Sequence, residues 1–95
     1  MGLEFVEFWM AVEEEFGFPV EEIDAARILT VGDMVDYLGR KTGLGFVNQI
    51  RVGGRYVALT EERLLAEVIR VLEMTLGEVG PVDRSSRFVE DLGMG

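Results

Sequence analysis

The sequence predicts a small all-α domain with three long helices, one short helix and a long, turn-rich loop. Three observations support this class. Three segments repeat apolar residues with the helical period, each of them stops at a glycine, and two of them begin at a threonine that can cap a helix. The chain has 95 residues, of which 48% are hydrophobic, so we expect residues 1–95 to form one domain around one core.

The first predicted helix, residues 3–16, contains the only tryptophan and has three kinds of face. The face expected in the core carries Phe5, Trp9, Val12 and Phe16, and the face expected in solvent carries Glu4, Ala11 and Glu15. Between them lies a mixed stripe of Leu3, Val6, Glu7, Met10, Glu13 and Glu14. An unpaired buried carboxylate costs several kcal/mol, so this stripe is not core. It is either the edge of the core or a docking face.

The other helices follow from their caps and periods. One or two helical turns are expected within residues 20–28. Thr30 with Asp33 predicts a capping box for a second long helix, which reaches Arg40 and Lys41. Thr60 is expected to cap the third long helix, residues 60–77. Its predicted buried stripe consists of Leu65, Val68, Ile69, Leu72 and Leu76, and the loop of residues 78–95 is expected to be anchored by Phe88, Val89 and Leu92.

Residues 42–59 differ from the helical segments. They contain four glycines and a composition rich in strand-forming residues. Two short runs, residues 50–52 and 55–57, flank Gly53-Gly54, which is a typical two-residue hairpin turn. An isolated hairpin is marginally stable unless it packs on something else. A hairpin and an irregular linker are therefore equally supported.

Composition excludes several functions. The chain has no cysteine and no histidine, which removes thiolate and imidazole catalysis and the commonest metal ligands. We expect no enzyme activity and no metal site. No apolar run could span a membrane and no secretory signal is present, so we expect a cytoplasmic protein without a membrane partner.

Charge is unevenly distributed in a chain whose net charge is −9. Residues 1–26 hold eight acids and no Lys or Arg, whereas residues 37–60 hold Arg40, Lys41, Arg51 and Arg55 and no acid. This field disfavours nucleic acid and favours basic protein surfaces as partners.

Residues 85–94 read Ser-Ser-Arg-Phe-Val-Glu-Asp-Leu-Gly-Met. They resemble the end of the long loop of acyl carrier proteins, where Phe-x-x-Asp-Leu-Gly precedes Asp-Ser-Leu. The helix that follows in that family resembles residues 3–17, which end in Glu-Glu-Glu-Phe-Gly. Thr30-Val-Gly-Asp33 resembles the start of the family's last helix, and residues 60–77 resemble its first helix.

The pieces occur in rotated order, so the chain resembles a circularly permuted acyl carrier protein. Residues 60–95 resemble the family's N-terminal part, residues 1–41 its C-terminal part, and residues 42–59 would be the connector. The resemblance implies the family's four-helix bundle, with three long helices and one short one. It also implies either a monomer whose two parts close on each other or a domain-swapped dimer.

The permutation point falls at the family's attachment serine, which carries 4′-phosphopantetheine. By this alignment Gly2 stands at the serine position and Gly95 at the position of the preceding Asp. Glycine has no hydroxyl group, so we expect no cofactor on this chain. Ser85 and Ser86 align with turn residues upstream in the loop rather than with the attachment site.

Two functions remain open. The first is an acyl-carrier-like domain that docks, through its mixed acidic stripe, on acyl-processing enzymes with basic surfaces, as in fatty acid or polyketide biosynthesis. Family resemblance implies that the helix after the serine is the recognition helix. The alternative is a non-carrying interaction or dimerisation module on the same fold.

Overall fold

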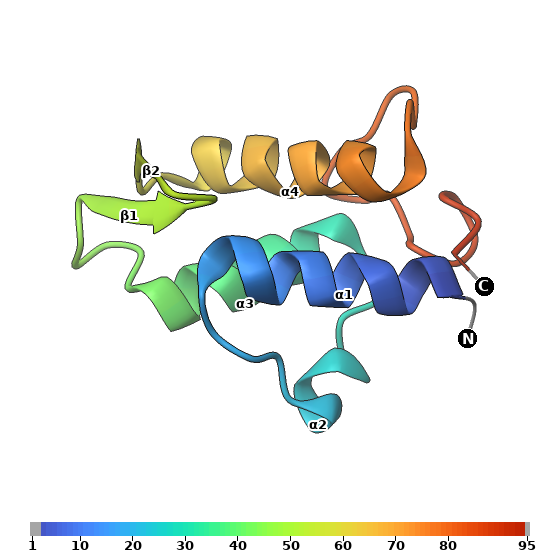
Figure 1. Ribbon diagram of the computed structural model, residues 1–95, viewed down its shortest axis with the longest axis horizontal. Helices are drawn as coiled ribbons and strands as arrows, with labels where there is room; N and C mark the ends of the chain where they lie inside the picture. The colour runs from blue at the N-terminus through green and yellow to red at the C-terminus, as the bar shows by residue number, and fades with distance from the viewer. Residues whose placement is uncertain (1–2, 95) are drawn as a thin grey trace.

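The computed structural model describes residues 3–94. The described chain is mostly helical, with four helices and one two-stranded sheet (Figure 1). In chain order the elements are α1 (Leu3–Phe16), α2 (Glu22–Ala25), α3 (Val31–Thr42), β1 (Gln49–Val52), β2 (Arg55–Ala58) and α4 (Glu61–Leu76). The three long helices and the short one are confirmed. The structure is mostly helical rather than all-α, because residues 49–58 form the sheet, and of the two forms left open for the connector the hairpin is the one present. Within residues 3–94 no helix combines the length and the apolar character needed to cross a membrane.

The predicted caps of the long helices are present. The Thr30 side chain accepts a hydrogen bond from the Asp33 backbone N–H at 3.0 Å, and the Asp33 carboxylate accepts one from the Thr30 N–H at 3.1 Å. This reciprocal capping box satisfies two donors at the start of α3. At its other end Gly43 adopts a left-handed conformation, with φ of 93°. Helix α3 therefore begins and ends where local chemistry predicts.

Residues 49–58 form an antiparallel hairpin in which Val52 pairs with Arg55 across the Gly53-Gly54 turn. Both turn glycines have positive φ, 58° and 82°, as a two-residue turn between twisted strands requires. The hairpin packs on the helices: Val52 and Val57 are buried, and the Gly53 N–H donates to the Glu15 backbone oxygen at 2.8 Å. That packing stabilises a hairpin that would be marginal alone.

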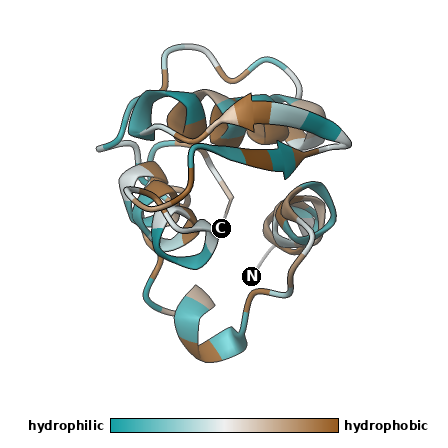
Figure 2. Cartoon of the chain, turned by 90° about the vertical axis from the view of Figure 1, so that its left-hand side faces the viewer, coloured by the Kyte–Doolittle hydropathy of each residue, from teal (hydrophilic) through white to brown (hydrophobic). Residues whose placement is uncertain are grey.

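The core lies where α4 packs against both α1 and α3 (Figure 2). On α1 the predicted core residues Phe5, Val12 and Phe16 are buried, but Trp9 is only half-buried. Phe8, which belongs to none of the three predicted faces, is fully buried. The reason is that its ring lies 5.3 Å from that of Phe88, in the C-terminal loop.

The predicted buried face of α4 and the predicted solvent face of α1 both need correction. The reason is that α4 packs against α1 as well as α3. Its buried residues are Leu64, Glu67, Val68, Val71 and Leu72, whereas Leu65, Ile69 and Leu76 are half-buried. On α1, the expected solvent face is exposed only at Glu4. Ala11 is half-buried, and Glu15 is half-buried in an ion pair with Arg70 of α4.

The C-terminal loop is held against the start of α3. The N–H groups of Val31 and Gly32 donate to the Ser86 and Arg84 carbonyls at 2.9 and 2.8 Å. The Phe88 N–H donates to the Leu29 carbonyl at 3.1 Å. Of the three predicted anchors, Phe88 is fully buried and Leu92 is half-buried. Val89 is 51% exposed, so the prediction that it anchors the loop was wrong. Met94, which was not predicted as an anchor, is fully buried.

Candidate docking surface and attachment position

The mixed stripe of α1 is largely open to solvent. Val6 and Met10 are 43% and 61% exposed, and Glu7 and Glu14 are exposed. Val6, Met10 and Glu14 are spaced by four residues, so they follow one line along the helix, with Glu7 beside it. We refer to Val6, Glu7, Met10 and Glu14 as the acidic face. Apolar side chains flanked by carboxylates are suited to a protein surface that presents Lys or Arg around an apolar centre.

Glu13 and Leu3 complete the predicted stripe but stand apart from these four. Glu13 is half-buried, and its carboxylate accepts a hydrogen bond from the Val20 N–H at 2.7 Å. This bond fixes the chain after Gly17, so the Glu13 side chain serves the fold. The side chain of Leu3 lies outside the described part of the structure.

An open hollow of about 540 Å³ continues the acidic face at the C-terminal end of α1. Its lining residues are Met10, Glu13, Glu14, Gly17, Phe18 and Pro19. A partner side chain that contacts Met10 would therefore meet both apolar and carboxylate groups.

The predicted attachment position lies at the start of α1. Gly2 and Gly95 are both outside the described residues. The described segments on either side of that position converge: the Phe88 ring lies 5.8 Å from the Phe5 ring. A hollow of about 260 Å³ beside them is lined by Glu4, Leu76, Glu78, Val79, Asp91 and Leu92, and none of these side chains carries a hydroxyl or thiol nucleophile.

The two serines are structural parts of a turn. The Ser85 hydroxyl donates to the Asp83 carboxylate at 2.6 Å, and the Ser86 hydroxyl accepts from the Asp83 N–H at 3.0 Å. The hydrogen bonds that Ser85 donates lower the pKa of Asp83. The same turn supplies the Ser86 carbonyl to Val31, so both serines lie at the start of α3.

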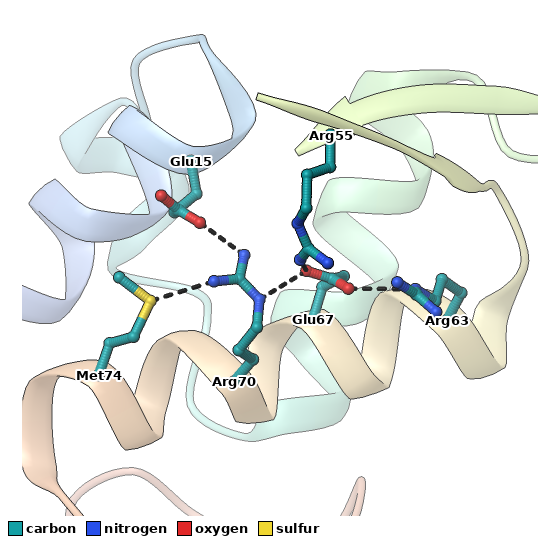
Figure 3. A network of polar contacts seen from close by, with 6 residues as sticks. All are labelled: Glu15, Arg55, Arg63, Glu67, Arg70 and Met74. Atoms are coloured by element: carbon teal, nitrogen blue, oxygen red, sulfur yellow. Dashed lines mark hydrogen bonds and ion pairs between the residues drawn. The ribbon is translucent and has the colours of Figure 1, made fainter. Parts of the chain in front are cut away.

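An ionic cluster around one buried carboxylate joins the hairpin, α4 and α1 (Figure 3). Its centre is Glu67, which is 3% exposed. Glu67 accepts hydrogen bonds from Arg63 and Arg70 at 3.1 and 2.8 Å, and Arg55 of β2 lies 3.6 Å away. Arg70 also pairs with Glu15, and its hydrogen bond to that carboxylate raises the pKa of the guanidinium group. Sequence reasoning missed this cluster, although the spacings of three and four residues around Glu67 were a signal for pairing along one helix face.

A second polar site surrounds Tyr37 of α3. Its hydroxyl is buried and has no hydrogen-bond partner within the described residues. Burial, followed by the nearby Asp24 carboxylate, raises the pKa of Tyr37. An adjoining cavity of about 170 Å³ is lined by Asp24, Arg27, Ile28, Asp33, Asp36, Tyr37 and Arg40. The lining contains three carboxylates and two guanidinium groups, so this cavity does not select a ligand of one charge.

Together these features define a small, mostly helical domain with an exposed acidic helix and a hairpin fixed to its core. One stretch of the chain is similar to acyl carrier proteins. It is 46% identical over 40 residues to the acyl carrier protein of Nitratidesulfovibrio vulgaris strain DP4 and, to the same extent, to that of strain Hildenborough. The match covers 42% of this chain and 53% of each relative, so the chain spans about half the length of the curated relatives it matches. No family model and no solved structure matches the chain.

Proposed function

We propose that the chain is an acyl-carrier-like domain that docks on acyl-processing enzymes through the acidic face of α1. The observation that carries the proposal is the exposure of Val6, Glu7, Met10 and Glu14 on one helix. That helix belongs to a chain similar to acyl carrier proteins over 40 residues. No basic residue occurs within residues 1–26, so a basic partner would meet an uninterrupted negative field there.

The rotated order of the family's pieces is part of this proposal. Two structural features support it. Helix α4 and the following loop lead in space to the start of α1, where Phe88 contacts the Phe5 and Phe8 rings. The hairpin joins the end of α3 to the start of α4, which is the connection that a permuted chain would need.

Docking can be tested by reversing charge on the acidic face. Replacing Glu7→Lys together with Glu14→Lys should weaken binding to a basic condensing synthase that accepts acyl carrier proteins by about tenfold. Two exposed ion pairs are each worth up to about 1 kcal/mol, and tenfold corresponds to about 1.4 kcal/mol. Titration calorimetry at low and high salt measures the change.

The matched control is Glu62→Lys with Glu73→Lys, which changes net charge equally at two exposed positions of α4 outside the acidic face. This pair should leave binding nearly unchanged. Equal weakening by both pairs would show that overall charge alone governs the encounter. An affinity that changes neither with the charge reversal on the acidic face nor with salt concentration would contradict docking through α1.

Whether the chain can carry an acyl group is a separate part of the proposal. Glycine at position 2 has no hydroxyl to accept a phosphoryl group, and the two serines are engaged in the turn at Asp83. We expect no mass increase when the chain is incubated with coenzyme A and a phosphopantetheinyl transferase. Gly2→Ser should restore modification only where the two ends of the chain close around the start of α1, and an acyl carrier protein serves as the positive control. A modified Ser85 or Ser86 would overturn this assignment.

A further inference from the structure

A second exposed surface, of opposite charge, lies at the end of the molecule that the hairpin and the C-terminal end of α3 form. It consists of Arg40 and Lys41 in the last turn of α3, Arg51 of β1, and the aromatic rings of Phe46 and Tyr56. We call this set the basic end. Figure 1 places its segments together at the left, away from the start of α1, and Figure 2 views the molecule from that side.

The basic end is unusually open for a surface with large rings. Phe46, in the turn before β1, is 95% exposed, and Tyr56 of β2 is 72% exposed. Arg51 and Tyr56 are cross-strand partners, and the guanidinium group lies 6.0 Å from the centre of the ring. Exposed apolar groups beside cations are typical of an interaction surface for an acidic partner.

The same chain carries the complementary surface. The acidic face of α1 presents two exposed apolar residues, Val6 and Met10, beside the carboxylates Glu7 and Glu14. The acidic face lies along α1, whereas the basic end is formed by the end of α3, the following loop and the hairpin. A second copy of the chain can present one surface to the other.

Net charge opposes this association but does not prevent it. Two chains of charge −9 repel each other at long range. At physiological ionic strength the Debye length is about 8 Å, which is much shorter than the 34 × 28 × 23 Å extents of the molecule. Whole-molecule repulsion is then largely screened, and ion pairs in direct contact are screened less.

We propose that the basic end binds the acidic face of a second copy of this chain. The contact is heterologous, since a different surface is used on each molecule, so a bound pair still has one surface of each kind free. Association therefore continues into chains or rings rather than stopping at a symmetric dimer. It also competes with any basic partner for the acidic face. The proposal does not depend on the carrier role, because its test involves this chain alone.

Sedimentation equilibrium over a concentration series tests the proposal. At physiological salt the weight-average mass of the full chain should rise continuously with concentration and pass about twice the monomer mass. At high salt it should fall toward the monomer mass. A chain that stays monomeric at all concentrations, or that stops at a dimer, would overturn the proposal.

Two variants with exposed substitutions test which surfaces meet. The helix variant is Met10→Ser with Glu14→Gln, and the basic-end variant is Phe46→Ser with Arg51→Ser. Each variant should remain monomeric alone, because each lacks one of the two surfaces. An equimolar mixture should form a 1:1 complex, since each variant supplies the surface that the other lacks. Self-association of either variant alone, or a mixture that stays monomeric while the unmodified chain associates, would contradict the contact. Circular dichroism confirms that both variants are folded.

Discussion

Replacing Phe88→Ala is expected to lower the free energy of unfolding by about 3–5 kcal/mol, the usual cost of removing a fully buried phenylalanine ring. Phe88 is fully buried and its ring lies 5.3 Å from that of Phe8 and 5.8 Å from that of Phe5. The substitution leaves a cavity and removes both aromatic contacts. Urea unfolding followed by circular dichroism measures the change.

The neighbouring residue provides a control in the same loop. Val89 is 51% exposed, so Val89→Ala should change the free energy of unfolding by no more than about 0.5 kcal/mol. Similar losses for the two variants would mean that the loop is not anchored by Phe88. A further expectation is local: Phe88→Ala should increase amide exchange at Val31 and Gly32, whose N–H groups bond to this loop.

The second large effect is expected at the ionic cluster. Arg70→Met should destabilise the fold by about 2–3 kcal/mol, somewhat below the 3–5 kcal/mol that is typical when one partner of a buried ion pair is removed. Methionine retains much of the apolar stem of arginine, so the loss is mainly electrostatic. It leaves Glu15 without this partner, and Glu67 keeps only Arg63 and the more distant Arg55.

A combined variant tests that cause. If the unpaired carboxylate of Glu15 produces the loss, then Glu15→Gln should restore part of the stability when added to Arg70→Met, because Glu67 keeps Arg63 and Arg55 as partners. Arg87→Met, on the exposed side of the loop, is the matched control for removing one arginine and should have little effect. Additive losses from Arg70→Met and Glu15→Gln would contradict the electrostatic explanation.

Local chemistry was sufficient to predict the helices. The capping box at Thr30, the threonine at position 60 and the glycines after each long helix act within a few residues, so their effect is visible in the sequence. The hairpin was undecided for the opposite reason. Its turn is local, but its stability depends on burying Val52 and Val57 and on the hydrogen bond from Gly53 to Glu15. Those contacts come from distant parts of the chain.

The candidate site shows the same division. Exposure of Val6, Glu7, Met10 and Glu14 agrees with the pattern of α1, although their docking role stays a prediction. The pattern could not show that Glu13 accepts a hydrogen bond from Val20, because that contact requires the chain to turn back after Gly17. Glu67 was missed because a carboxylate on a helix is normally placed in solvent, and its three arginine neighbours come from two different elements.

The hairpin also bears on how quickly the chain can fold. Glu15 and Arg70 are separated by 55 residues, so their contact requires the closure of a long loop. A two-residue turn closes rapidly, and it leaves α3 and α4 antiparallel and adjacent (Figure 1). Once it has formed, α3 and α4 meet through a nearly local search, and the docking of α1 is the main non-local step that remains. The segment that joins the two parts of the fold thus lowers the entropy that must be lost before the core can assemble.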